Sequence, residues 1–192
     1  MKHFIAITCL ALLAFAPALR GEQKELKVGD PAPTFEATDD QGKAFKSADV
    51  VGKKVLVVYF YPADLTNGCT KQACGFRDVM KDLTDKGVEV VGVSGDSVEN
   101  HKIFKKDRQL NYTLLADEKG DVAKQFGVPF KPGPSVAKVT DTAGNKLELT
   151  RGGTAQRWTF VIGKDGKIAY KNDQVKPAED AKTILEVVEK LK

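Results

Sequence analysis

Two cysteines five residues apart are the first chemically informative feature of this sequence. Cys69 and Cys74 lie in the stretch YFYPADLTNGCTKQACGFRD, directly after the apolar run KVLVV. Apolar side chains at helical spacing predict a helix from about Gly68 to Lys86. A thiol in the first turn of a helix is favoured as the thiolate, because free backbone N–H groups and the helix dipole stabilise the negative charge. Cys69 is therefore a candidate nucleophile.

The five-residue spacing limits how the two thiols can pair. In an ideal helix, residues i and i+5 have Cα atoms roughly 8–9 Å apart on different faces, whereas a disulfide generally needs less than about 7 Å. A permanent Cys69–Cys74 disulfide would exclude the helix, and a catalytic pair would require a helix that unwinds and re-forms. Gly68 and Gly75 bracket the pair, and an interior glycine costs about 1 kcal/mol of helix stability relative to alanine.

The residue types alone leave a static disulfide and a peroxide-reactive thiolate with its own resolving thiol as open alternatives. A structural metal site is disfavoured, because the chain has only two histidines, His3 and His101, to complete a tetrahedral zinc site with two thiols. We therefore expect no metal.

Length and composition indicate a globular protein of one domain. The chain has 192 residues, 29% of them charged, and a net charge of +4. The densest basic stretch, HKIFKKDRQ, is typical of the solvent-facing side of a helix. We therefore expect no nucleic-acid partner.

The N-terminus has the pattern of a secretory signal peptide. Lys2 and His3 precede the uncharged run from Phe4 to Ala18, which is shorter than the roughly 20 residues that span a bilayer as a helix. We expect a cleaved leader over residues 1–21, a single domain over 22–192, export to the periplasm or medium, and no stable membrane association after cleavage. Cleavage would remove the third cysteine, and an oxidising compartment permits a disulfide between the remaining two.

Export gives a prediction that is simple to check. N-terminal sequencing of the native protein should place the mature N-terminus between about Leu19 and Gln23, given the usual distance from the apolar run to the cleavage site. Retention of residues 1–18 would contradict export by a cleaved leader.

Alternating strand and helix signals predict an α/β protein with a mixed central sheet flanked by helices. The residues around Asp141–Asn145, within the long segment 129–153, are either a hairpin or a loop near the site. Strands are predicted over 34–45 as a short pair, over 53–61, 88–96 and 112–117, and as a hairpin over 157–172, and helices over 68–86, 97–110, 119–127 and from Pro177 onward.

The site residues resemble those of a known family. Pro62, Thr66 and Cys69 reproduce the Pro-x-x-x-Thr-x-x-Cys motif of peroxiredoxins, and the longer stretch resembles the PrxQ branch, also called bacterioferritin comigratory proteins. The similarity continues through VVGVSGDSVENHKIF, YTLLADEKGDVAKQFGV and RWTFVIGKDGKI, covering most of residues 28–190. It implies a thioredoxin-like fold.

The resemblance implies a role for each matched residue. Cys69 would be the peroxidatic cysteine and Cys74 the resolving cysteine of an atypical two-cysteine enzyme. Thr66 would hydrogen-bond the peroxide and the thiolate, Pro62 would shield the thiolate from water, and Arg157 would hold the thiolate and polarise the peroxide. From the residues alone, Thr66 also fits the N-cap of the helix.

The implied activity is reduction of hydrogen peroxide or organic hydroperoxides, with a thioredoxin-like or other external dithiol as reductant. It implies no haem, flavin or other cofactor, and we expect a monomer or weak dimer. One alternative is a thiol–disulfide oxidoreductase, against which the absence of a C-x-x-C motif argues. The other is a non-enzymatic module with a static Cys69–Cys74 disulfide.

Overall fold

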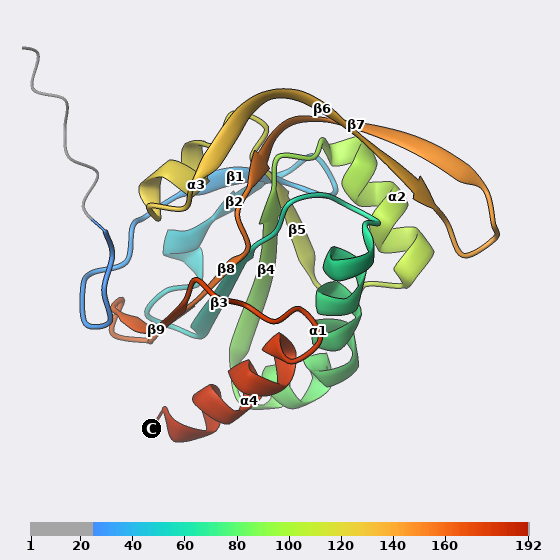
Figure 1. Ribbon diagram of the computed structural model, residues 1–192. Coiled ribbons are helices and arrows are strands. Elements are labelled where there is room, and N and C mark those ends of the chain that lie inside the picture. The colour runs from blue at the N-terminus through green and yellow to red at the C-terminus, as the bar shows by residue number, and fades with distance from the viewer. Residues whose placement is uncertain (1–24, 192) are drawn as a thin grey trace, which may run out of the picture.

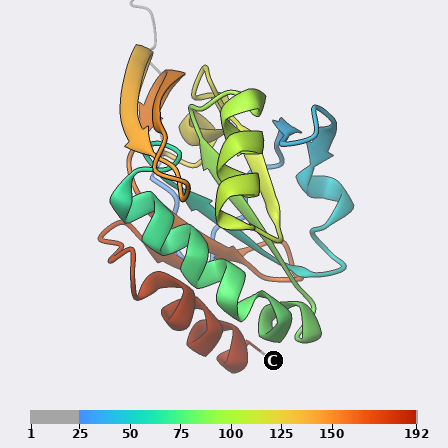
Figure 2. The ribbon, with the colours of Figure 1, turned by 90° about the vertical axis from the view of Figure 1, so that its right-hand side faces the viewer.

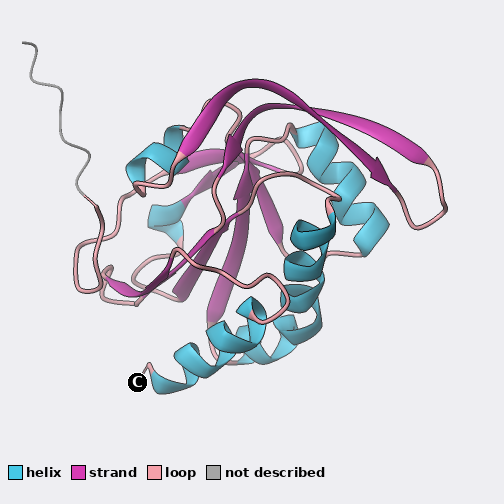
Figure 3. Ribbon diagram, in the orientation of Figure 1, coloured by secondary structure: helices cyan, strands magenta, loops and turns pink. Residues whose placement is uncertain are grey.

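The computed structural model describes residues 25–191, which form a twisted sheet covered on both faces by helices (Figures 1 and 3). The predicted leader lies outside the described residues, so export stays a prediction. None of the helices in the described part of the chain is both long and apolar enough to cross a membrane.

Seven strands form the central sheet in the order β2-β1-β5-β4-β3-β8-β9. β4 runs parallel to its neighbours β3 and β5, and the other pairings are antiparallel. The predicted mixed sheet is thereby confirmed. The strands are β1 (Glu36–Asp39), β2 (Ala44–Lys46), β3 (Val55–Phe60), β4 (Val88–Ser94), β5 (Thr113–Ala116), β8 (Trp158–Ile162) and β9 (Ile168–Asn172).

The helices divide between the two faces of the sheet. Alternate residues of the fully buried strand β3 point to opposite faces, with Val57 and Tyr59 in the apolar cluster beneath α1 and α4 and Phe60 in the cluster against α3. The helices are η1 (Ser47–Asp49), α1 (Asn67–Asp85), α2 (Val98–Arg108), α3 (Asp121–Gln125) and α4 (Asp180–Lys190). The sequence prediction for α1 is correct to within one residue at each end, whereas α4 begins at Asp180 and not at Pro177.

The long segment after α3 forms a separate two-stranded antiparallel sheet, β6 (Phe130–Thr140) and β7 (Lys146–Ala155). Of the two alternatives for the residues around Asp141–Asn145, the structure therefore has the hairpin. Its inward side chains, Ala137, Val139 and Leu149, are buried in the same apolar cluster as Cys69. The hairpin arches over the end of the sheet from which α1 starts (Figure 1).

Helices α1 and α4 lie side by side on one face of the sheet (Figure 2). Gly75 allows this close packing, because a Cβ atom added there would lie only 3.3 Å from the Ala181 Cβ of α4. Gly75 therefore serves the α1–α4 contact as well as lowering the stability of α1.

Candidate active site

The loop between β3 and α1 is held by buried polar side chains. The Asp64 carboxylate accepts a 2.7 Å hydrogen bond from the Tyr61 hydroxyl and lies 2.7 Å from His101 Nδ1. The Asp64 backbone N–H donates to Asp96, 3.0 Å away, and burial together with the neighbouring Asp64 carboxylate raises the pKa of Asp96 to about 6. Leu65 has φ 58°, which is uncommon for a residue with a side chain. These contacts fix the loop that leads into the first turn of α1.

Pro62 and Thr66 stand at the two ends of this loop. Pro62 lies two residues past the end of β3, and Thr66 occupies the N-cap position of α1. The Thr66 hydroxyl makes no capping hydrogen bond and instead donates to the Ala63 carbonyl at 2.9 Å. The prediction that Thr66 is the N-cap residue of α1 is therefore confirmed by its position, but its hydroxyl does not cap the helix and instead closes the turn before it.

Cys69 and Arg157 meet at the start of α1. Cys69 is the third residue of the helix and is 1% exposed. Arg157, directly before β8, donates a hydrogen bond from Nη2 to Cys69 Sγ over 3.1 Å. The guanidinium lies close against the first turn of α1, since a Cβ added at Gly68 would be in van der Waals contact with Nη2 at 3.4 Å. A guanidinium in this position favours the thiolate over the thiol.

Cys74 lies on the same helix but in a different environment. Both cysteines are free thiols, and both lie within the unbroken helix α1. Cys74 is partly exposed and lines a surface hollow between α1, the end of α2 and β6, together with Thr66, Arg108 and Val139. This geometry argues against a static disulfide, because residues i and i+5 of a helix are too far apart to be bonded.

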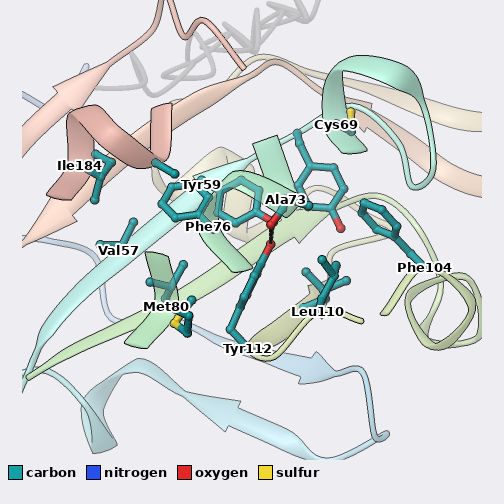
Figure 4. Packing of buried hydrophobic residues seen from close by; sticks show 14 of the residues in the cluster. Val57, Tyr59, Cys69, Ala73, Phe76, Met80, Phe104, Leu110, Tyr112 and Ile184 are labelled. Atoms are coloured by element: carbon teal, nitrogen blue, oxygen red, sulfur yellow. Dashed lines mark hydrogen bonds between the residues drawn. The ribbon is translucent and has the colours of Figure 1, made fainter. Parts of the chain in front are cut away.

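Aromatic side chains beneath α1 anchor its backbone between the two cysteines (Figure 4). The Tyr112 hydroxyl donates a 3.1 Å hydrogen bond to the carbonyl of Ala73, and the Tyr59 hydroxyl lies 2.8 Å from that of Tyr112. Phe76 stacks on Tyr59 with ring centroids 4.8 Å apart. The buried face of α1 thus has both apolar packing and a polar attachment.

A chain of buried polar groups continues from Arg157 into the protein. Gln72 accepts a hydrogen bond from Arg157 Nη1, and it donates to Asp180 at 2.7 Å. Asp180 also accepts from Thr159 at 2.8 Å. Sequence reasoning missed these groups: Gln72 lies one turn after Cys69 and could have been found by its spacing, but the start of α4 carries no local signal for Asp180.

The arrangement supplies a buried sulfur nucleophile, a permanent positive charge beside it and a second thiol five residues away. These are the groups needed for thiol redox chemistry. Within residues 25–191, no cluster of three or more His, Cys, Asp or Glu side chains is placed to hold a metal ion.

Comparison with known families agrees with this chemistry. Residues 28–171 match the AhpC/TSA family, and the chain therefore belongs to that family of thiol peroxidases. Within it the chain is a peroxiredoxin of the Q/Bcp type. It is 41% identical over 166 residues to the chloroplastic peroxiredoxin Q of Sedum lineare, covering 85% of this chain and 78% of the relative. It is 39% identical over 160 residues to peroxiredoxin Bcp of Escherichia coli K12, covering 83% and 94%.

Solved structures give the same fold. Peroxidoxin BcpB from Mycobacterium tuberculosis superposes with a TM-score of 0.71 at 30% identity, over 88% of this chain and 99% of that one. A cysteine-to-serine mutant of PrxQ from Xylella fastidiosa gives 0.70 at 23% identity, over 86% and 97%. The predicted thioredoxin-like peroxiredoxin fold is confirmed.

Proposed function

We propose that Cys69 is the peroxidatic cysteine and Cys74 the resolving cysteine of this peroxidase. The observation that carries the proposal is the buried Cys69 sulfur in the first turn of α1, with Arg157 Nη2 at 3.1 Å. The positive charge of the Arg157 guanidinium and the positive end of the α1 helix dipole both favour the thiolate form of Cys69.

In the first step the Cys69 thiolate attacks one oxygen of the peroxide. An S–O bond forms, the O–O bond breaks, and the leaving oxygen takes up a proton as water or an alcohol, so that the thiolate becomes a sulfenic acid. Arg157 stabilises the developing negative charge, the Thr66 hydroxyl hydrogen-bonds the peroxide, and Pro62 limits access of water to the sulfur.

In the second step Cys74 attacks the sulfenic sulfur. The Cys69–Cys74 disulfide forms and the sulfenic oxygen leaves as water. An external dithiol then reduces this disulfide by thiol–disulfide exchange and is itself oxidised to a disulfide. Because α1 holds the two thiols apart, its first turns must unwind before the second step.

The activity is tested by rapid mixing of the reduced protein with hydrogen peroxide and with an organic hydroperoxide. We expect fast loss of one thiol equivalent followed by loss of the second. Absence of any reaction with either peroxide would refute the assignment of Cys69.

The unwinding step predicts a difference in hydrogen exchange between the two redox forms. Within residues 68–78, the amides from Thr70 onward should be protected in the reduced protein, because the Thr70 N–H is the first in α1 that bonds to the carbonyl four residues before it. The same amides should exchange rapidly in the disulfide form. Helix α2 serves as the internal control and should be equally protected in both. Identical protection of residues 68–78 in the two forms would show that no unwinding accompanies oxidation.

A further inference from the structure

Asp180 is a buried carboxylate with no role in the chemistry described so far. It is the first residue of α4 and is 2% exposed. Its Oδ2 accepts both hydrogen bonds, from Gln72 Nε2 and Thr159 Oγ1, while Oδ1 is buried without a hydrogen-bond partner among residues 25–191. A buried carboxylate with one unpaired oxygen contributes little to the stability of the fold. Stability therefore does not explain why an aspartate occupies this position.

The connection to the site runs through one side chain. Gln72 is fully buried, one helical turn after Cys69, and its amide oxygen accepts a hydrogen bond from the guanidinium of Arg157. Arg157 in turn donates to the sulfur over 3.1 Å. Four groups therefore form one continuous hydrogen-bonded series from Asp180 to the sulfur.

The chemistry of the amide gives this series a direction. The Gln72 side chain has a donor end and an acceptor end, and an ionised carboxylate only accepts. Asp180 therefore holds the donor end, which turns the acceptor end toward Arg157. Without Asp180 the amide could rotate and present its N–H groups to the guanidinium, which has donors only.

The amide also keeps the two opposite charges apart. A carboxylate in direct contact with Arg157 would neutralise part of its charge, whereas Gln72 holds the guanidinium with a neutral oxygen and leaves the negative charge one side chain further away. The charge of Arg157 then acts mainly on the sulfur.

We propose that Asp180 is a positioning residue for the peroxide step, which orients Arg157 toward Cys69 through the amide of Gln72. This rests on the proposed function of Cys69 and Arg157. Burial raises the pKa of the Asp180 carboxyl, and the hydrogen bonds from Gln72 and Thr159 oppose that rise, in keeping with a group whose ionised form those two donors stabilise.

The first test compares Asp180→Ala with Asp180→Asn. Asp180→Ala should lower the second-order rate constant with hydrogen peroxide by about tenfold, a barrier change of about 1.4 kcal/mol, and should move ionisation of the Cys69 thiol to higher pH. Asp180→Asn should stay within about threefold of the wild type, because its amide oxygen can accept both hydrogen bonds. Glu179→Gln, at the exposed neighbouring position, is the matched control and should change neither property.

A second variant separates positioning from a general loss of packing. Gln72→Met should reproduce the effect of Asp180→Ala, and combining the two should add no further loss, because both interrupt the same series. Additive losses would overturn the proposal. The proposal is also overturned if folded Asp180→Ala has the wild-type rate with peroxide and the wild-type ionisation of the Cys69 thiol. If Asp180→Ala does not fold, the same two wild-type values in Gln72→Met overturn the proposal.

Thiol ionisation can be read without any peroxide. In a background that carries both Cys9→Ser and Cys74→Ser, Cys69 is the one cysteine left in the sequence, so the pH dependence of alkylation by iodoacetamide reports on Cys69 alone. If the wild-type protein does not react with peroxide, the proposed function is refuted. The role of Asp180 is still decided by comparing the pH dependence of Cys69 alkylation between the wild type and Asp180→Ala.

Discussion

Cys69→Ser should abolish peroxide turnover, with a rate indistinguishable from that of the uncatalysed reaction. Cys74→Ser should react with one equivalent of peroxide at the wild-type rate and then stop as the sulfenic acid. The reason is structural: Cys69 is buried at the first turn of α1 beside Arg157, and Cys74 lies two turns into the same helix, partly exposed.

The two variants form a matched pair, since each replaces one sulfur by oxygen in the same helix. Rapid-mixing kinetics and mass spectrometry after trapping of the sulfenic acid with dimedone distinguish them. Excess peroxide should carry Cys74→Ser further, to sulfinic acid, because no thiol removes the sulfenic acid. Equal peroxide reactivity of the two variants would contradict the assignment of roles.

Arg157→Met should slow the peroxide step by more than tenfold, equivalent to at least about 1.4 kcal/mol of barrier. Methionine fills part of the same volume but supplies neither the charge nor the 3.1 Å hydrogen bond to the sulfur. The pH at which the Cys69 thiol ionises should rise in parallel, because a cation beside the sulfur favours the thiolate.

Arg151→Met is the control for the loss of a partly buried arginine. Arg151 lies on β7, where it donates to Thr154 and Ser135 at 3.0 Å each, so its removal should leave the peroxide rate unchanged. A wild-type rate in Arg157→Met, measured at several pH values, would show that the contact with Cys69 has no part in the reaction.

The sequence carries the local part of the site and much of the fold. Strand β3 and helix α1 are recognisable because their apolar patterns have the periods of buried strand and helix, and Pro62, Thr66 and Cys69 lie within eight residues of one another. Arg157 could be singled out only by resemblance to the family, since one arginine before a strand has no distinctive pattern.

Contacts between distant segments could not be predicted in this way. Asp180 lies 108 residues after Gln72, and the residues around it resemble an ordinary charged helix start. The contacts that hold the loop between β3 and α1 could not be predicted either, because Asp64 and His101 are 37 residues apart in the sequence. The predicted start of α4 is wrong for a related reason. Pro177 favours a first helical turn, but the helix begins at Asp180, which is buried against Gln72.

The attachment of α1 between its two cysteines has an electrochemical consequence. If the disulfide forms as proposed, unwinding breaks the hydrogen bond from Tyr112 to the Ala73 carbonyl and loosens the packing of Gly75 on Ala181. The free energy of these contacts is then available only to the dithiol form, so it raises the reduction potential of the Cys69–Cys74 couple, by about 30 mV for every 1.4 kcal/mol. Packing on the buried face of one helix would thereby make the disulfide easier to reduce, and widen the range of dithiols able to regenerate the enzyme.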